Sequence, residues 1–276
     1  MTTPPRAPDL HAPVVVTNDD GFDSEGLREL AAAAAALGFE VTVAAPLQQA
    51  SGTSAAMTVI AGDGRVMIQQ REVPGLSRAS GYAVQAAPAF IAFTAAQGAY
   101  GPRPALLLSG INRGPNTGRA VLHSGTVGAA MTAATLGIPA GAFSLDCGEA
   151  EDAHWKTAAA VATEVIPALP GLPAGSLLNV NVPNVTPGRL RGIRRARLAE
   201  SGAVQVSVTD TNDDHIQVTM AESGAPPAPG SDSALLAAGY ASVTVLRPIC
   251  ELPGQELPWL AETPDPPDQP DSALRR

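Results

Sequence analysis

The sequence places two adjacent carboxylates, Asp19 and Asp20, directly after a short apolar run, Val14–Thr17. A run of β-branched residues that ends in polar residues and glycine is typical of a buried strand in a parallel sheet. Open α/β sheets bind ligands just beyond the carboxyl ends of such strands. Adjacent carboxylates repel each other, so a pair at that edge either shares a proton or binds a cation. The alternative is a solvated turn, because Asn, Asp and Gly favour turns for conformational reasons.

A second stretch that could bind a ligand, residues 109–131, follows another apolar run, Ala105–Leu108. Its glycines and asparagines permit close approach of the backbone to a ligand. Within it, Ser124, Gly125 and Thr126 open a predicted helix. A helix N-terminus offers unpaired N–H groups and a partial positive charge, which favours binding of a phosphate. The alternative is that Ser124 serves only as a helix N-cap.

Two further features lie near these stretches. The segment Leu47–Thr58 is small, rich in hydroxyl groups and centred on residues 51–54; by itself it indicates a flexible loop. His123 precedes the predicted phosphate-binding turn and could contact substrate or transfer a proton. For this histidine, a structural role in shaping the turn is favoured over catalysis.

Alternating strands and helices would position these residues. Strands are predicted at 14–17, 41–45, 105–108, 140–145, 177–182 and 241–246, and helices at 25–37, 88–98, 124–136, 155–169 and 233–239. Phe90, Ile91, Phe93 and Thr94 are expected on the buried side of the second helix. An edge strand is expected at 65–70, and short antiparallel strands at 192–198, 205–208 and 216–220. This order predicts an α/β fold with a mostly parallel sheet. No GxGxxG follows the first strand, so a dinucleotide-binding fingerprint is absent.

The composition narrows the class of protein. The 276 residues suffice for one large or two small domains, and the net charge of −9 argues against binding a long nucleic acid, which needs a basic stripe. The two cysteines, Cys147 and Cys250, lie far apart, so a disulfide framework or zinc-finger spacing is absent. With no apolar signal core at the start and no apolar run of membrane-spanning length, we expect a cytoplasmic protein that does not enter a membrane.

Four segments, taken in order, resemble the SurE family of stationary-phase survival proteins, which are 5′/3′-nucleotidases. They are VVVTNDDGFDSEGL, the loop around Ser51, LLLSGINRGPNTG and HSGTVGAAM. The segments LNVNVP and GYASVTVL extend the resemblance over about residues 13–248. The family implies a Rossmann-like core of three layers with a mostly parallel sheet, plus a small β-rich C-terminal extension. It also implies a homodimer or dimer of dimers that exchanges C-terminal elements.

The resemblance also implies a set of metal ligands: Asp19, Asp20, Ser51 and Asn112. All four supply oxygen, which suits one Mg²⁺ or Mn²⁺ per subunit, whereas zinc would favour His or Cys. Elementary electrostatics agrees with a cation here. Each contact between a phosphate charge and a carboxylate at 4 Å costs roughly 4 kcal/mol at an effective dielectric constant of 20. A divalent cation between them makes the interaction attractive.

For catalysis, Asp19 and Asp20 are expected to act together with Asn18, which could donate a hydrogen bond to the phosphate or to the attacking water. Ser124, Gly125 and Thr126 would hold phosphate oxygens at the helix N-terminus, where charge stabilisation favours phosphoryl transfer. Asn116 and its neighbouring glycines would shape the substrate side of the pocket.

The sequence departs from the family pattern at supporting positions. Residues 86–92 read AAPAFIA where the family commonly has a GTPADCV-like segment, so Phe90 replaces an aspartate. Further departures are Ala56, Ala120, Thr132 and Ala133, which replace polar or glycine residues of the family. These changes leave the metal ligands intact and predict a pocket that is less polar than usual.

The sequence therefore predicts a hydrolase of the 5′-nucleotidase type. It would be a divalent-metal-dependent phosphomonoesterase that converts nucleoside 5′/3′-monophosphates to nucleoside and phosphate. The alternatives are a phosphatase of a specialised, non-nucleotide ester and a catalytically weakened SurE-like binding protein. The metal-phosphatase core would span 13–187, and the β-hairpin extension with its dimerisation elements would span 188–262. Residues 1–12 and 263–276 are expected to be disordered tails.

Overall fold

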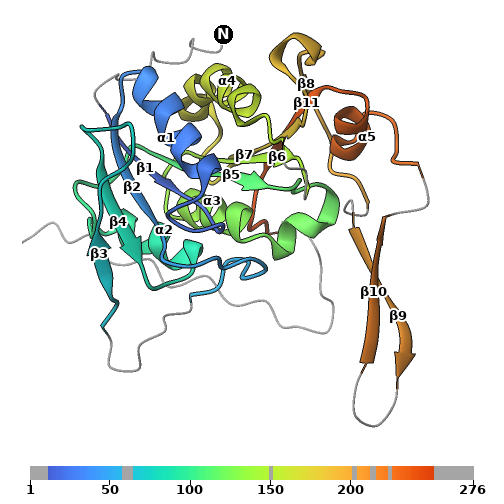
Figure 1. Cartoon of the computed structure of the whole chain (residues 1–276), viewed down its shortest axis with the longest axis horizontal. Helices are drawn as coiled ribbons and strands as arrows, with labels where there is room; N and C mark the ends of the chain where they lie inside the picture. The colour runs from blue at the N-terminus through green and yellow to red at the C-terminus, as the bar shows by residue number, and fades with distance from the viewer. Residues whose placement is uncertain are drawn as a thin grey trace, which may run out of the picture.

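A nine-stranded sheet with helices on both faces forms the centre of the molecule (Figure 1). The computed structural model describes residues 12–57, 65–148, 152–200, 204–211, 216–222 and 226–251. The predicted α/β class and the mostly parallel sheet are confirmed.

The strands of this sheet lie in the order β3-β4-β2-β1-β5-β6-β7-β11-β8. Their bounds are β1 Pro13–Thr17, β2 Glu40–Pro46, β3 Ile68–Gln70, β4 Ser80–Val84, β5 Leu106–Arg113, β6 Ala140–Asp146, β7 Leu177–Pro183, β8 Ile193–Arg195 and β11 Ala241–Leu246. The six strands from β4 to β7 are mutually parallel, whereas β3 and β11 run antiparallel to their neighbours β4 and β7.

The order of the strands reverses between β1 and β5. From β1 the chain adds β2 and β4 on one side, then returns to add β5, β6 and β7 on the other side. At such a reversal the two connections leave in opposite directions, which opens a crevice at the carboxyl ends of the strands. The switch point therefore lies directly beside the acidic pair that follows β1.

The four longer helices cover the two faces in pairs (Figure 1). They are α1 Glu25–Ala36, α2 Pro88–Ala96, α3 Gly125–Thr135 and α4 Trp155–Val165. One apolar core joins α1 and α4 to the sheet, and a second core joins α2 and α3 to the opposite face. Successive β1 residues alternate between them, with Val14 and Val16 in the first core and Val15 in the second. Burial on both faces explains the unbroken apolar run.

Four expectations need correction. The short strand β4 was not predicted, and it supplies a parallel neighbour to β2. The expected edge strand at 65–70 is restricted to Ile68–Gln70. Phe93, expected on the buried side of α2, is 37% exposed. The strand expected at 192–198 shrinks to β8, which pairs in parallel with β11 because it joins the edge of the main sheet rather than a separate hairpin.

A separate two-stranded antiparallel sheet, β9 Val204–Thr211 with β10 Ile216–Glu222, extends from the main body (Figure 1). It confirms the antiparallel pair expected in the extension. The short helix α5, Asp232–Ala237, lies between β10 and β11. The domain division at residue 187 and the disordered tails stay predictions, since most of both tails lies outside the described residues. Within the described part of the chain, we find no helix that is both long and apolar enough to cross a membrane.

Replacing Gly26 by alanine should destabilise the fold, because α1 packs on β5 at this glycine. An added Cβ would lie 2.0 Å from the Ile111 carbonyl oxygen and 2.9 Å from the Trp155 ring. We expect Gly26→Ala to lower the free energy of unfolding by about 1–3 kcal/mol, measured by urea denaturation. Gly188→Ala is the matched control, since no atom lies within 4 Å of its added Cβ. Equal denaturation midpoints for both variants would contradict the tight α1–β5 contact.

Candidate metal and phosphate site

The acidic pair and Asn112 meet at the switch point. Asp19 and Asp20 follow β1, and Asn112 lies near the carboxyl end of β5, the neighbouring strand. A direct contact joins the two segments: the backbone N–H of Arg113 donates to Asp20 Oδ2 over 3.0 Å. Sequence reasoning did not identify this donor, because a backbone group carries no sequence signal.

A bulge in β5 positions Asn112. The pairing of β5 with β6 shifts register between Ser109 and Asn112, and Gly110 lies within this irregularity with φ of +127°. A Cβ on Gly110 would lie 2.2 Å from the Phe143 carbonyl oxygen, so only glycine fits there. The Asn112 amide donates from Nδ2 to the carbonyl oxygens of Arg113 (3.2 Å) and Gly114 (2.8 Å). Both amide hydrogens are thus used, which leaves Oδ1 as the oxygen that could bind a cation.

Asp19 is held against the N-terminus of α3. Its side chain is 4% exposed, and the Thr126 hydroxyl donates to Asp19 Oδ1. A Cβ on Gly125 would lie 2.8 Å from Asp19 Oδ2, so this glycine allows the helix to approach the carboxylate. Ser124 is nearly buried, and its hydroxyl accepts from the Val127 N–H over 3.1 Å. Ser124 is therefore the N-cap of α3, and a phosphate-binding role for this turn stays a prediction.

Burial makes both carboxylates hold a proton more tightly than a free carboxylate does. Burial raises the pKa of Asp19 above its ordinary value of 3.8, although hydrogen bonds from Thr126 and nearby backbone groups oppose the shift. Burial also raises the pKa of Asp20 to about 6; the Arg113 N–H opposes this shift, and the charge of Asp19 adds to it. The side chain of Arg113 donates to the Gly148 carbonyl over 3.0 Å, and its positive charge also lowers the pKa of Asp20. Asp19 is therefore supported by neutral donors, whereas Asp20 has a neutral donor and the nearby charge of Arg113.

The loop that carries Ser51 is tied to the acidic pair. The Ala50 N–H donates to the Asp19 carbonyl oxygen over 2.8 Å, and the Thr53 hydroxyl donates to the Ala50 carbonyl over 2.8 Å. Farther along, Ser54 Oγ donates to the Leu122 carbonyl at 2.5 Å. Ser51 itself is exposed and accepts a hydrogen bond from the Gln49 amide over 3.0 Å. These hydrogen bonds anchor the loop, whereas its composition indicated a freely flexible one.

The side chain of Asn18 is fully buried and engaged in its own turn. Its Nδ2 donates to the Gly21 carbonyl (3.0 Å) and to Ser24 Oγ (2.7 Å), and its Oδ1 accepts from the Gly21 N–H (3.2 Å). Both amide hydrogens are occupied in this arrangement. The geometry favours a positioning role, in which Asn18 fixes the turn after the acidic pair, over the predicted donation to phosphate or water.

Asn116 is held by a buried polar cluster that sequence reasoning missed. Its backbone N–H donates to Asn181 Oδ1 (2.7 Å), and its carbonyl accepts from the side chains of Asn179 (2.8 Å) and Asn181 (3.0 Å). Its own amide donates to Ser144 Oγ over 2.8 Å. The signal was the pattern LNVNV in β7, because an asparagine in a buried strand requires hydrogen-bond partners.

A second anchor holds the same loop from the other side. Asp232, the first residue of α5, is fully buried. Its carboxylate accepts from the N–H groups of Gly118 (2.8 Å), Ala199 (2.9 Å) and Ser233 (2.8 Å). The C-terminal part of the chain thereby fixes the segment between Asn116 and the start of α3.

His123 and the departures from the family pattern lie around this centre. His123 is exposed and ends the 3₁₀-helix η1, Gly118–His123, just before the Ser124 cap. Ala120 is exposed in the same turn, whereas Ala133 is fully buried in α3. The Thr132 hydroxyl donates within its own helix to the Gly128 carbonyl over 2.8 Å. None of these three substituted residues adds a charge to the centre.

The donor set fits a hard divalent cation. The buried Asp19 and the half-buried Asp20 both accept hydrogen bonds from neutral donors, and the Oδ1 atom of Asn112 remains as an acceptor at the same strand ends. Across the described ranges, no cluster of three or more His, Cys, Asp or Glu side chains occurs. A cation here would therefore combine two carboxylates with neutral oxygens, as Mg²⁺ and Mn²⁺ do.

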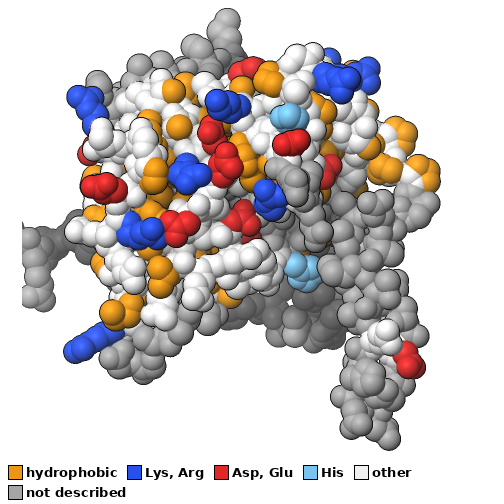
Figure 2. Space-filling model, in the orientation of Figure 1, with side chains coloured by type: hydrophobic (Ala, Val, Ile, Leu, Met, Phe, Trp, Pro, Cys, Tyr) orange, Lys and Arg blue, Asp and Glu red, His pale blue; other side chains and the backbone are white. Residues whose placement is uncertain are grey.

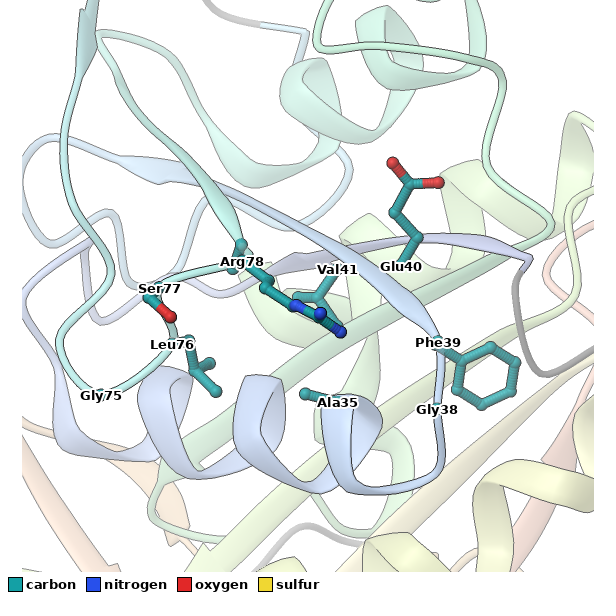
Figure 3. A pocket seen from close by; sticks show the side chains of 10 residues that line it. Ala35, Gly38, Phe39, Glu40, Val41, Gly75, Leu76, Ser77 and Arg78 are labelled. Atoms are coloured by element: carbon teal, nitrogen blue, oxygen red, sulfur yellow. The ribbon is translucent and has the colours of Figure 1, made fainter.

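Two cavities lie at opposite ends of the parallel sheet. A cavity of about 280 Å³ adjoins the Ser51 loop and is lined by Ala50, Thr53 and Ala87, among others. A larger cavity of about 550 Å³ lies where β2 begins, with Glu40 and Arg78 in its lining (Figure 3). The larger cavity is remote from the acidic pair, because Glu40 starts the strand whose other end leads to the loop.

Charged side chains of both signs lie on one face of the molecule (Figure 2). On the face shown in Figure 2, Lys and Arg side chains are interspersed with Asp and Glu rather than gathered into one stripe. The predicted absence of a nucleic-acid polymer among the partners stays a prediction, which rests on the net charge of −9.

The raised pKa of Asp20 predicts a stability that falls with pH when metal is removed. Between 3.8 and about 6 the folded protein holds this proton more tightly than the unfolded chain, so the free energy of unfolding decreases as pH rises. In EDTA we expect a loss of about 2 kcal/mol from pH 4 to pH 7, less than the full shift because Asp20 is partly exposed. Asp20→Asn should flatten this slope in urea titrations, and Asp152→Asn, an exposed control, should not. An unchanged slope in Asp20→Asn would refute the assignment of this pH dependence to Asp20.

Comparison with known proteins places this site in a family. The family described as "Survival protein SurE" matches residues 14–205. The chain is similar to the 5′-nucleotidase SurE of Methylococcus capsulatus, with 35% identity over 239 residues, covering 85% of this chain and 90% of the relative. It is 35% identical over 241 residues to the 5′/3′-nucleotidase SurE of Proteus mirabilis, covering 85% and 89% of the two chains. The crystal structure of the SurE protein from Aquifex aeolicus matches with a TM-score of 0.72 and 28% identity, covering 87% of this chain and 94% of that one. This chain belongs to the SurE family.

Proposed function

We propose that this protein is a phosphomonoesterase of the 5′-nucleotidase type, which hydrolyses nucleoside monophosphates to nucleoside and phosphate. The observation that carries the proposal is the buried Asp19 carboxylate in contact with the N-terminus of α3 at the switch point of the sheet. Its relatives from Methylococcus capsulatus and Proteus mirabilis bear the names 5′-nucleotidase and 5′/3′-nucleotidase.

The proposal includes one divalent cation per subunit, Mg²⁺ or Mn²⁺, held by Asp19, Asp20, Ser51 and Asn112. When bound, such a cation neutralises phosphate charge and lowers the pKa of a coordinated water. The carboxylates of Asp19 and Asp20 support it by their position and by their need for a positive neighbour, since burial disfavours their charged forms.

The chain's own residues perform the remaining tasks in this proposal. The turn at Ser124, Gly125 and Thr126 presents a helix N-terminus towards the phosphate, and its partial positive charge favours the developing negative charge. Asn18 fixes the turn that carries the acidic pair. Asn116 borders the substrate side, held rigidly by the asparagines of β7.

We also propose a homodimer or dimer of dimers in the cytoplasm. The sheet β9–β10 is separate from the main sheet, and a two-stranded hairpin alone is marginally stable in water. Cover by a second copy of the chain would stabilise it. The two cysteines are free, with Cys147 buried and Cys250 exposed, which agrees with a reducing compartment.

Phosphate release should depend on metal and on Asp19. We expect hydrolysis of p-nitrophenyl phosphate and of AMP, GMP, CMP and UMP with Mg²⁺ or Mn²⁺, and none with EDTA. Asp19→Asn keeps the shape of the side chain but weakens cation binding, so it should lower kcat/KM by more than about 100-fold. Steady-state phosphate release measures both effects.

Two controls make this test decisive. Asp152→Asn removes an exposed carboxylate and should retain the wild-type rate. Circular dichroism and the denaturation midpoint should show that Asp19→Asn is folded. An unchanged rate in folded Asp19→Asn would refute the site assignment, and no release with any metal would favour a SurE-like binding protein.

The proposed assembly predicts a molar mass that depends on the hairpin. Light scattering coupled to size exclusion should give at least twice the 27.9 kDa of one chain. A variant in which a Gly-Ser linker replaces residues 204–222 should elute as a monomer, because the separate sheet is removed. A monomeric full-length chain at micromolar concentration would contradict the proposal.

A further inference from the structure

The smaller cavity lies at the ligand-binding edge of the sheet. It is lined from two sides by the segment Pro46–Ala50 with Thr53, which follows β2, and by Val84–Ala87, which ends β4 and begins α2. Since β4, β2 and β1 are parallel neighbours, their carboxyl ends share one edge. The cavity therefore opens at the same edge as the acidic pair.

Two contacts make the wall of this cavity continuous with the metal and phosphate site. Ala50 lines the cavity, and its N–H donates to the Asp19 carbonyl oxygen over 2.8 Å. Thr53 lines it as well, and its Oγ1 lies 3.0 Å from the point where a Cβ on Gly125 would sit. A phosphate ester held at Gly125 would thus lie beside Thr53, a residue of the cavity wall.

The lining has the chemistry of a site for an uncharged ring. Val84, Ala86 and Ala87 are buried and give an apolar floor, and Leu47 adds an apolar wall. Among the described residues that line the cavity, none is charged; Gln48, Gln49 and Gln85 contribute amides. An amide both donates and accepts hydrogen bonds, so these side chains can match the mixed polar edge of a heterocycle.

The size of the cavity agrees with part of a ligand rather than a whole one. Its volume of about 280 Å³ is just below the range of about 300–1,000 Å³ typical of complete ligand pockets. A single ring system fits such a space while the charged phosphate stays outside. The larger cavity offers a different environment, because the Arg78 and Glu40 side chains border it (Figure 3).

We propose that the cavity between Leu47 and Ala87 binds the uncharged, planar nucleobase, the part of the leaving nucleoside that is remote from the phosphate, and so determines substrate preference. The inference rests on the proposed phosphomonoesterase function and extends it by naming the residues that recognise the part of the ester remote from phosphate. The departures at 86–92 then act on the choice of substrate, because Ala86 and Ala87 form the cavity floor.

The test compares AMP with ribose 5-phosphate, which carries the same phosphate ester without a base. Ala87→Leu fills the cavity; it removes no cap, because Ala87 precedes α2 without a side-chain hydrogen bond. We expect KM for AMP to rise about tenfold, the scale of one or two misplaced methylenes, with KM for ribose 5-phosphate changed by less than about twofold. Leu47→Ala enlarges the cavity from its partly exposed wall and should raise KM for AMP alone by about threefold.

Ser77→Leu is the matched control, since Ser77 lines the remote cavity, and it should alter neither KM. Equal changes for both substrates in Ala87→Leu and Leu47→Ala, or no change for AMP, would overturn the inference.

If the wild type hydrolyses neither ester, the proposed reaction is wrong, and calorimetry with adenosine then decides the cavity's role. Adenosine binding that Ala87→Leu weakens at least about tenfold would uphold the inference, whereas absent or unaltered binding would refute it.

Discussion

The burial of Asp19 beside the first turn of α3 is the interaction on which the rest of the site depends. A carboxylate that is 4% exposed needs compensation, and the protein supplies it with the Thr126 hydroxyl and with the helix N-terminus that Gly125 allows to approach. The same residue's carbonyl holds Ala50, and hence the Ser51 loop. One residue thereby connects β1, the loop after β2 and the helix after β5, three segments that a phosphate-ester site at the switch point requires.

A layer of buried polar contacts surrounds this centre and fixes the substrate side. Asn179 and Asn181 hold the backbone of Asn116, and Asp232 holds Gly118. These groups are costly to bury unless each finds a partner, so they specify one position for the loop rather than adding much net stability. These contacts hold the loop rigidly, whereas the described lining of the cavity that includes Ala87 carries no charge. The proposed pocket thus has one polar, preorganised side and one uncharged side.

Local patterns predicted the core of the fold and the acidic pair because their signals are contained in a few residues. VVVT is apolar on both faces and is followed by NDDG, so the strand and its polar end are evident together. β4 was missed because SGYAV is short and only partly apolar, and its place is set by pairing with β2 and β3. The direction of β8 likewise depends on β11. The pattern LNVNV in β7 indicates that Asn179 and Asn181 need hydrogen-bond partners, but it does not identify the distant Asn116 as that partner. For Asn18, residue type alone was misleading. An asparagine beside the acidic pair suggested a chemical role, but its side-chain amide is occupied by hydrogen bonds to Gly21 and Ser24.

The switch point has a consequence for the order of folding. β1 lies between β2, which follows it closely in the chain, and β5, which begins about ninety residues later. The unit from β1 to β2 can form from local contacts, but Asn112 and the start of α3 reach Asp19 only after that long loop has closed. A cation held by all four proposed ligands would bind only the completed sheet, and by mass action would stabilise it without favouring partly folded chains. Cation affinity would then measure how completely the two halves of the sheet have docked. The metal would bind late in folding and stabilise only the native arrangement of the strands.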